Sequence, residues 1–153
     1  MKRLQIIREA ACRSLGRREV LGGTIASIAL ACSGGADAPQ PFGEVSAGNA
    51  EALSVGSIRI IPGAPACIAR DARGIYAMTL TCTHEGCDIA TEGTVSASSI
   101  VCGCHGSEFD ANGDVVRGPA TSPLDHFAVT TDTSGNLTVN GGTVVPASER
   151  LAF

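Results

Sequence analysis

The sequence predicts an all-β domain, and three features of composition and pattern lead to this expectation. Nineteen glycines and seven prolines among 153 residues indicate frequent turns between short elements. From residue 52 onward, runs of β-branched and other apolar residues are separated by such turns, which is typical of strands. No window after residue 45 shows the apolar spacing of an amphipathic helix. The length fits one small domain with extensions, and an apolar content of 44% can supply its core.

The first 31 residues differ from the rest and resemble an export signal. They contain six of the eleven basic residues, and residues 20–31 then form an uncharged, mostly apolar run. This run of 12 residues is well short of the roughly 20 needed to span a bilayer. The adjacent Arg17 and Arg18 look like those of a twin-arginine signal, and an ordinary signal peptide with two neighbouring arginines is the alternative.

The end of this signal allows two interpretations. Residues 29–31, Ala-Leu-Ala, fit a small-residue cleavage site before Cys32. The same cysteine, followed by Ser-Gly-Gly, resembles a lipoprotein junction, although Ala29 stands where such junctions usually have leucine. The protein is therefore expected to be exported across the cytoplasmic membrane. It would then be periplasmic, or held at the cell envelope by a lipid on Cys32.

The remaining elements follow in order along the chain. Residues 32–52 are expected to form a flexible linker, because Gly, Ala, Pro and Ser dominate most of this segment. Turns are expected at residues 71–74 and at Asn112-Gly113, where the Asn-Gly pair favours positive φ. The expected strands are residues 57–61, 66–70, 74–80, 99–102, 114–116, 127–131, 137–140 and 143–145.

Two short boxes concentrate cysteine and histidine on the expected loops. They are residues 82–87, Cys-Thr-His-Glu-Gly-Cys, and residues 102–107, Cys-Gly-Cys-His-Gly-Ser. Two thiolates and two imidazoles can hold a [2Fe–2S] cluster with unequal irons. Zinc in a Cys₂His₂ site is an alternative, although the H-x₃₋₅-H spacing of zinc fingers is missing. Two disulfides among the four cysteines, with ordinary surface histidines, are another.

The net charge of a centre with two thiolates and two imidazoles favours the uptake of an electron. Four thiolates around two ferric irons and two sulfides leave a net charge of about −2, whereas two thiolates and two neutral imidazoles leave about zero. An electron enters a neutral site more easily than an anionic one. Centres of this mixed type have potentials of roughly −150 to +300 mV, against about −400 mV for plant-type ferredoxins.

The boxes resemble those of the Rieske iron–sulfur family, whose pattern is C-x-H, a spacer of about 15 to 17 residues, and C-x-x-H. Residues 85–101 form the spacer here. The resemblance implies that Cys82 and Cys102 bind one iron of a [2Fe–2S] cluster. It implies that His84 and His105 bind the other.

The resemblance also implies a fold and a disulfide. The family fold is an antiparallel β sandwich, expected over residues 53–153, with a small cluster-binding subdomain inserted at about residues 80–122. Cys87 and Cys104 stand where one branch of the family has two mutually bonded cysteines. That disulfide-containing, higher-potential branch includes the Rieske subunit of cytochrome bc complexes and the small subunit of arsenite oxidase.

Further positions match family features around the cluster. Ser107 corresponds to a serine whose hydroxyl donates to a bridging sulfur, and Phe109 stands where the respiratory branch usually has a tyrosine donor. Because hydrogen bonds tune the centre, the missing donor implies a lower potential. Gly118, Pro119 and Ala120 resemble the proline loop that covers the third side of the cluster, with a generic turn as the alternative.

The other cysteines and the last histidine are assigned no role at the cluster. Cys12 lies in the export signal, and Cys67 lies in an apolar stretch and is expected to be a buried, inert thiol. A bridge between Cys32 and Cys67 is the alternative. His126 lies beyond the boxes and is expected to be structural or simply exposed.

The expected function is one-electron transfer. The protein would be an exported carrier or the iron–sulfur subunit of a respiratory or periplasmic oxidoreductase, similar to quinol–cytochrome c reductase or arsenite oxidase. A cluster-stapled structural or redox-sensing surface protein is the main alternative. A Rieske oxygenase component is less favoured, because its mononuclear iron site needs two further histidines and only His126 remains.

The net charge of the chain after the export signal limits the kinds of partner that are expected. Residues 32–153 carry five arginines, no lysine and thirteen acidic residues, a formal net charge of −8. This leaves no basic surface for nucleic acid. An acidic surface could dock a basic redox partner, although solubility explains it equally well. The candidate partners are a c-type cytochrome, a larger oxidoreductase subunit and quinol, with membrane contact only through a lipid anchor.

Overall fold

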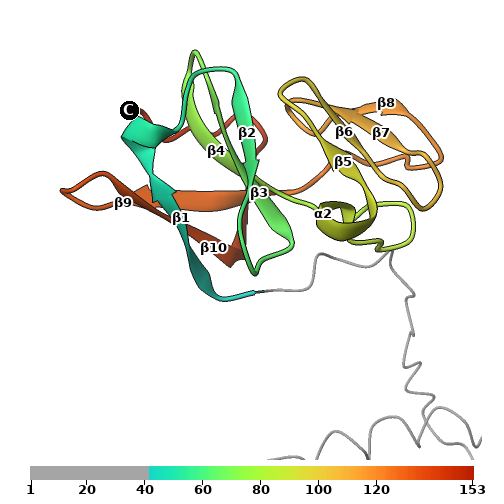
Figure 1. The fold of residues 1–153 in the computed structure, drawn as a ribbon, viewed down its shortest axis with the longest axis horizontal. Helices are drawn as coiled ribbons and strands as arrows, with labels where there is room; N and C mark the ends of the chain where they lie inside the picture. The colour runs from blue at the N-terminus through green and yellow to red at the C-terminus, as the bar shows by residue number, and fades with distance from the viewer. Residues whose placement is uncertain (1–41) are drawn as a thin grey trace, which may run out of the picture. The chain divides into compact units, whose positions relative to one another are not determined.

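The computed structural model describes residues 42–153, which form two antiparallel β-sheets and little helix (Figure 1). The predicted export signal and the candidate lipidation site Cys32 lie outside this range. Within it, no helix is both long enough and apolar enough to cross a membrane.

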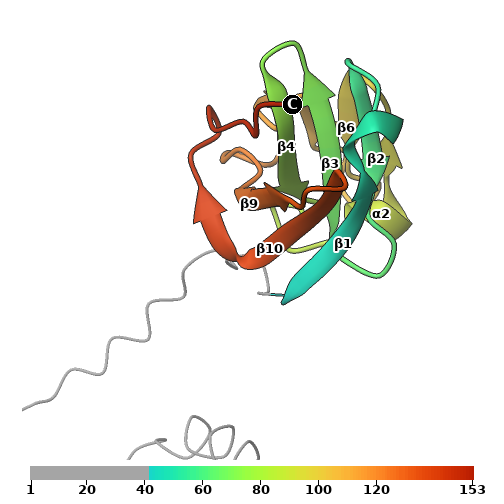
Figure 2. The ribbon, with the colours of Figure 1, turned by 90° about the vertical axis from the view of Figure 1, so that its left-hand side faces the viewer.

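The larger sheet has six strands in the order β1-β10-β9-β4-β3-β2, and all neighbouring strands are antiparallel. A single 3₁₀ turn, Ala50–Ala52, follows the first strand. Figure 2 shows β10, in red, and β1, in cyan, running side by side at one edge of this sheet. The six strands are β1 Glu44–Asn49, β2 Ser57–Ile60, β3 Ala66–Asp71, β4 Gly74–Thr79, β9 His126–Thr131 and β10 Asn136–Val145.

The two edge strands of this sheet approach each other because the sheet curls. The guanidinium Nη2 of Arg59, on β2, donates to the carbonyl of Ala47, on β1, over 2.7 Å. Neither edge strand pairs with the other, so this side chain is a direct hydrogen-bonded link between them.

The smaller sheet is an insert between β4 and β9. It has the strand order β5-β6-β7-β8 and is preceded by a four-residue helix, α2. Its elements are α2 Ile89–Glu92, β5 Thr94–Val95, β6 Ser99–Val101, β7 Glu108–Asp110 and β8 Val115–Arg117. Figure 1 shows this part, in yellow and orange, beside the larger sheet. The prediction of an all-β antiparallel fold with an inserted smaller part is confirmed.

The central strands β3 and β4 serve two hydrophobic cores at once. Ala66 and Ile68 of β3 pack into the core of the larger sheet, whereas Cys67 and Ala69 pack into a second core shared with the insert. Successive side chains of a strand point to opposite faces, so alternate residues reach different cores. Because both faces are covered, β3 is apolar at consecutive positions from Ala66 to Ala69.

The predicted linker is wrong for residues 44–52. Residues 44–49 are strand β1, paired with β10 from Glu44↔Asn140 to Asn49↔Asn136. The segment has few apolar residues, and its pairing with β10, not its own hydrophobic pattern, makes it a strand. The folded domain therefore begins before residue 53.

Most other predicted strands are confirmed with shifts of one residue at their ends. The strands predicted at residues 137–140 and 143–145 are one strand, β10, whose register with β9 shifts between Asn140 and Val144. Strands β5 and β7 and helix α2 were not predicted, because two to four residues are too short to show a hydrophobic period.

A stack of three side chains fastens the insert to the larger sheet. The Arg150 guanidinium lies 3.7 Å from the Tyr76 ring centroid, and the Tyr76 and His126 rings stack at 5.6 Å. Tyr76 donates through its hydroxyl to the Ala111 carbonyl at 2.8 Å, and His126 donates through Nε2 to the Asn112 carbonyl at 2.9 Å. Burial lowers the pKa of His126, which keeps its ring neutral. The expected structural role of His126 is confirmed.

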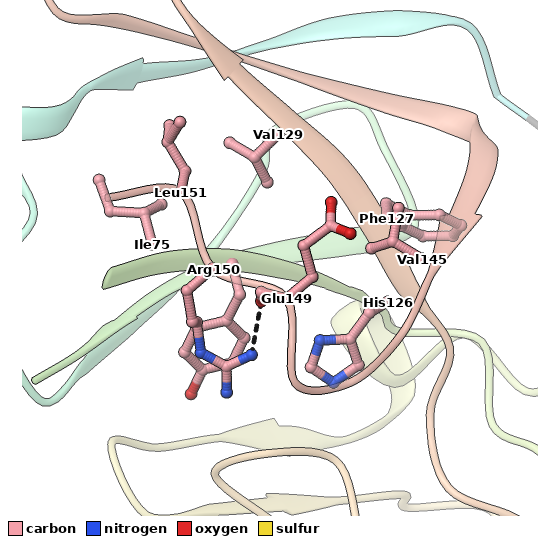
Figure 3. Close-up of a pocket in the computed structure, with 9 residues that line it drawn as sticks. Ile75, His126, Phe127, Val129, Val145, Glu149, Arg150 and Leu151 are labelled. Atoms are coloured by element: carbon pink, nitrogen blue, oxygen red, sulfur yellow. Dashed lines mark hydrogen bonds between the residues drawn. The ribbon is translucent and has the colours of Figure 1, made fainter. Parts of the chain in front are cut away.

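Arg150 ties this stack to the turn between β3 and β4. Its side chain is only 4% exposed, and its Nε lies 2.9 Å from Asp71 Oδ2. Figure 3 shows Arg150 and His126 on the wall of a cavity of about 140 Å³. Burial alone would raise the pKa of Asp71, but hydrogen bonds from Arg150 and Arg73 prevail and lower it to about 2. Asp71 Oδ1 also accepts from the backbone of Arg73 and Gly74, which closes the predicted hairpin turn.

We expect Asp71→Asn to destabilise the protein at neutral pH by about 2 kcal/mol, because Arg150 would remain buried without its carboxylate. A depressed carboxyl pKa contributes stability above the unfolded-state value near 4 and loses it as pH falls toward about 2. The difference in melting temperature between wild type and variant should therefore shrink over this range. Thermal unfolding followed by circular dichroism measures it, with Glu44→Gln as the control. A difference independent of pH would contradict the assignment.

Candidate metal centre

The two Cys/His boxes form two loops with the same backbone hydrogen bonds. The first loop, residues 82–87, lies between β4 and α2, and the second, residues 102–107, joins β6 to β7. In each loop the N–H of the first cysteine donates to the carbonyl five residues later. These bonds run from Cys82 to Cys87 at 2.8 Å and from Cys102 to Ser107 at 2.9 Å.

A glycine in the fifth position closes each loop. Gly86 and Gly106 have φ values of +73° and +77°, a region that other residues rarely adopt. Each glycine N–H donates back to the carbonyl of the loop's first cysteine, at 2.8 and 3.0 Å. The recurring Cys-x-x-x-Gly spacing of the two boxes thus has a common structural cause.

The first residue of each loop is a cysteine with an unbonded thiol, and the two thiols are neighbours. Cys82 and Cys102 are 3% and 1% exposed, and neither is in a disulfide. Burial is the main cause that raises the pKa of Cys82, and the adjacent Cys102 thiol adds to it. Buried apolar surroundings disfavour a free thiolate, so two such thiols suit a cationic iron centre that accepts them as thiolates.

The histidine rings of the two loops also meet. His84 and His105 have ring centroids 4.9 Å apart, with planes at 81°. Nδ1 of His84 is buried and has no hydrogen-bond partner among the described residues. Buried polar atoms are seldom left without a partner, and a ring nitrogen that ligates a metal would account for this one. The thiols and this nitrogen therefore fit an iron–sulfur centre.

The solvent side of the centre is occupied by His105 and Glu85. The His105 side chain is 47% exposed, and its Nε2 lies 3.7 Å from Oε2 of Glu85. The cysteines therefore lie on the buried side of the centre, and His105 lies at its surface.

A disulfide joins the two loops. Cys87 and Cys104 are bonded, with their Cα atoms 6.6 Å apart, as the family resemblance implied. The sulfur of Cys102 lies within 4.8 Å of both bonded sulfurs. Because a bonded sulfur offers no thiolate, these three cysteines do not form a separate metal site.

A third segment, residues 118–122, is fastened to both loops. The Ala120 N–H donates to the Ser107 hydroxyl at 3.0 Å, and the Thr83 hydroxyl donates to the Ser122 carbonyl at 2.7 Å. Ser107 is fully buried, and its hydroxyl lowers the pKa of Cys82 against the larger rise that burial causes. The predicted proline loop, which includes a cis Gly118–Pro119 bond, is thus held against the centre.

Phe109 and Cys67 lie in the core beneath the centre. Both are fully buried, and both belong to the core that contains Cys82 and Cys102. Burial raises the pKa of the Cys67 thiol to about 12, so the expectation of a buried, inert thiol is confirmed.

Several contacts around the centre were not predicted. Thr83 and Glu85 lie inside the first box, but nothing in the sequence indicated their partners. A Cβ on Gly103 would lie 1.7 Å from the Glu92 carbonyl, so the end of α2 packs directly on the second loop. These contacts join residues far apart in sequence, and a local pattern carries no signal for them.

Comparison with known proteins identifies the family. The model of the Rieske [2Fe-2S] domain family matches residues 44–128, more than half of the chain. The chain therefore belongs to this family, and its cofactor is a [2Fe–2S] cluster, for which the structure provides cysteine and histidine groups.

Similar sequences are found among cyanobacterial proteins. The cytochrome b6-f complex iron-sulfur subunit of Synechococcus elongatus is 44% identical over 64 residues, which are 40% of this chain and 35% of that protein. The corresponding subunit of Synechococcus sp. WH7803 is 48% identical over 54 residues, which are 35% of this chain and 29% of that protein. The chain thus spans about a third of the length of these relatives.

Two solved structures share 29% and 30% sequence identity with this chain. The plasma membrane Rieske protein PetC3 from Synechocystis PCC 6803 has a TM-score of 0.49 and 30% identity, covering 63% of this chain and 98% of that one. A complex of reduced oxygenase and oxidized ferredoxin in carbazole 1,9a-dioxygenase includes a chain with a TM-score of 0.49 and 29% identity, covering 67% of this chain and 97% of its own.

We expect the double variant Cys87→Ser, Cys104→Ser to lose its cluster much faster than wild type, because only the cluster itself and non-covalent contacts would then hold the two loops together. Removing this bond, with a sequence separation of 17, should also cost about 3 kcal/mol of stability. Bleaching of the visible absorbance on warming measures cluster loss. Cys67→Ala, which removes a thiol outside the loops, is the control, and equal bleaching rates in the two variants would refute a stapling role.

Proposed function

We propose that this protein transfers single electrons, either as an exported carrier or as the iron–sulfur subunit of a respiratory or periplasmic oxidoreductase. One observation carries the proposal: two adjacent buried free thiols and the unpartnered Nδ1 of His84 all belong to two loops that a disulfide joins. A [2Fe–2S] cluster at this place would supply reversible one-electron chemistry.

The proposed ligands are two buried cysteines and two histidines, of which His84 is half-buried and His105 exposed. Cys82 and Cys102 would bind one iron, and their burial keeps water from the thiolates. His84 and His105 would bind the other. Because His105 is half exposed, its outer edge would be the place where a partner approaches.

The residues around the ligands would hold them in place. The disulfide fixes the distance between the loops, and Thr83 and Ser107 connect both loops to residues 118–122. A rigid shell of this kind limits how far the ligands move when the charge of the centre changes, which keeps the reorganisation on electron transfer small.

Export is proposed from the basic, then apolar, pattern of residues 1–31, which the structure does not describe. The partner would be a redox protein, either a c-type cytochrome or a larger oxidoreductase subunit, with quinol as the small-molecule candidate. The relatives named as cytochrome b6-f subunits support a redox partner, but they match over only about a third of their length.

We expect His105→Ser to remove the visible colour and the EPR signal of the reduced protein, because one iron would lose a ligand. Iron content, the visible spectrum and EPR of protein purified without oxygen test this. His126→Asn is the matched control, since His126 is the one histidine of the chain outside the two boxes and is structural. A coloured, EPR-active His105 variant would contradict the ligand assignment.

We expect Ser107→Ala to lower the midpoint potential and Phe109→Tyr to raise it. The first removes a buried hydroxyl that lowers the pKa of Cys82, and the second adds a hydroxyl in the core that contains Cys82 and Cys102. A hydrogen bond to a charged group corresponds to roughly 60 mV for a one-electron couple. Protein-film voltammetry measures both. Shifts of the same sign would contradict the proposed tuning roles.

A further inference from the structure

The surface of the centre carries an acidic residue. Glu85 is the fourth residue of the first loop, its side chain is 62% exposed, and its carboxylate lies 3.7 Å from the exposed ring of His105. A partner that approaches the His105 edge must therefore also contact Glu85 or come very near it.

No arginine forms an ion pair with this carboxylate among the described residues, which contain five arginines and no lysine. Each arginine is engaged elsewhere. Arg59 and Arg70 bond backbone carbonyls, Arg73 and Arg150 pair with Asp71, and Arg117 pairs with Glu108.

Arg117 is the cation that comes closest to the loops, but its charge is already compensated. Its Nε lies 3.3 Å from the Gly106 carbonyl, and its Nη2 lies 3.5 Å from Glu108. The half-buried Asp88, three residues after Glu85, instead caps α2 by accepting from the Ala90 N–H. Glu85 is thus the charged group that the described residues place against the exposed ring of His105.

We infer that Glu85 makes this edge a docking surface for a positively charged redox protein. The inference rests on the proposed function and names the partner class. A carboxylate beside the ring steers a basic protein toward the edge and raises the rate of encounter at low salt. The same carboxylate would lose hydration without compensation in an apolar pocket, and it is repelled by an anionic membrane surface.

A purely local effect of Glu85 on the centre is the competing explanation. A negative charge beside a ligand changes the midpoint potential, and this changes the driving force for every electron acceptor in the same direction. A docking role instead depends on the charge of the acceptor. A cationic and an anionic acceptor therefore distinguish the docking role from the local effect on midpoint potential.

The experiment uses the full-length protein with its cluster, at fixed pH, as wild type, Glu85→Gln and Glu51→Gln. Glu51 is exposed and lies in the 3₁₀ turn after β1, outside both loops, so its variant controls for the overall charge. Stopped-flow spectroscopy follows oxidation of the reduced cluster by a basic c-type cytochrome and by the anion hexacyanoferrate. Calorimetry measures binding of the oxidised protein to the oxidised cytochrome, and voltammetry gives the midpoint potentials.

Glu85→Gln should slow the reaction with the cytochrome about fivefold at low salt, the effect of one unit charge at contact distance in water. It should accelerate the reaction with hexacyanoferrate and weaken cytochrome binding. The differences in rate and affinity between Glu85→Gln and wild type should vanish near about 1 M salt. Glu51→Gln should change each quantity much less.

Two results would overturn the inference. One is a change in reaction rate that has the same sign with both acceptors and the size that the change in midpoint potential predicts. The other is an equal effect of Glu51→Gln, which would mean that overall charge alone matters. Failure of the proposed function looks different, since the wild-type protein would then lack the cluster spectrum or would not pass electrons to either acceptor.

Discussion

The fold must hold two loops, one after β4 and one after β6, face to face around a single centre. Each loop is closed by its own backbone hydrogen bonds and a glycine turn, so local contacts set the conformation in which it presents its side chains. The bond between Cys87 and Cys104 then fixes the distance between the loops. The burial of the thiols, the meeting of the histidine rings and the position of residues 118–122 all depend on this arrangement.

The larger sheet supports the centre from below. Because β3 and β4 have two apolar faces, one face fills the sheet's own core and the other forms a floor under the loops. The insert is too small to bury a core alone, with strands of only two or three residues. Its buried side chains pack against the outer face of β3 and β4. For this reason Cys67 of β3 and Phe109 of β7 belong to the same cluster of buried side chains.

Features of the structure that depend on neighbouring residues could be predicted from the sequence, and most of those that depend on distant residues could not. Most strands of the larger sheet, the Asn112-Gly113 turn and the Cys87–Cys104 pair were predicted, since each has a local pattern or a family motif. Strand β1 was not, because its partner β10 lies about ninety residues away and its own sequence resembles a linker. The contact of Thr83 with Ser122 and that of Glu85 with His105 were also missed, for they arise only when separate loops meet.

The stack of Arg150, Tyr76 and His126 has a consequence for motion. It clamps the turn at Asn112 to the sheet, and the backbone of Leu151 pairs with Ile75 on the same side. These contacts fix the insert to the larger sheet through side chains of both parts. Any displacement of the centre that keeps them intact therefore carries the larger sheet with it.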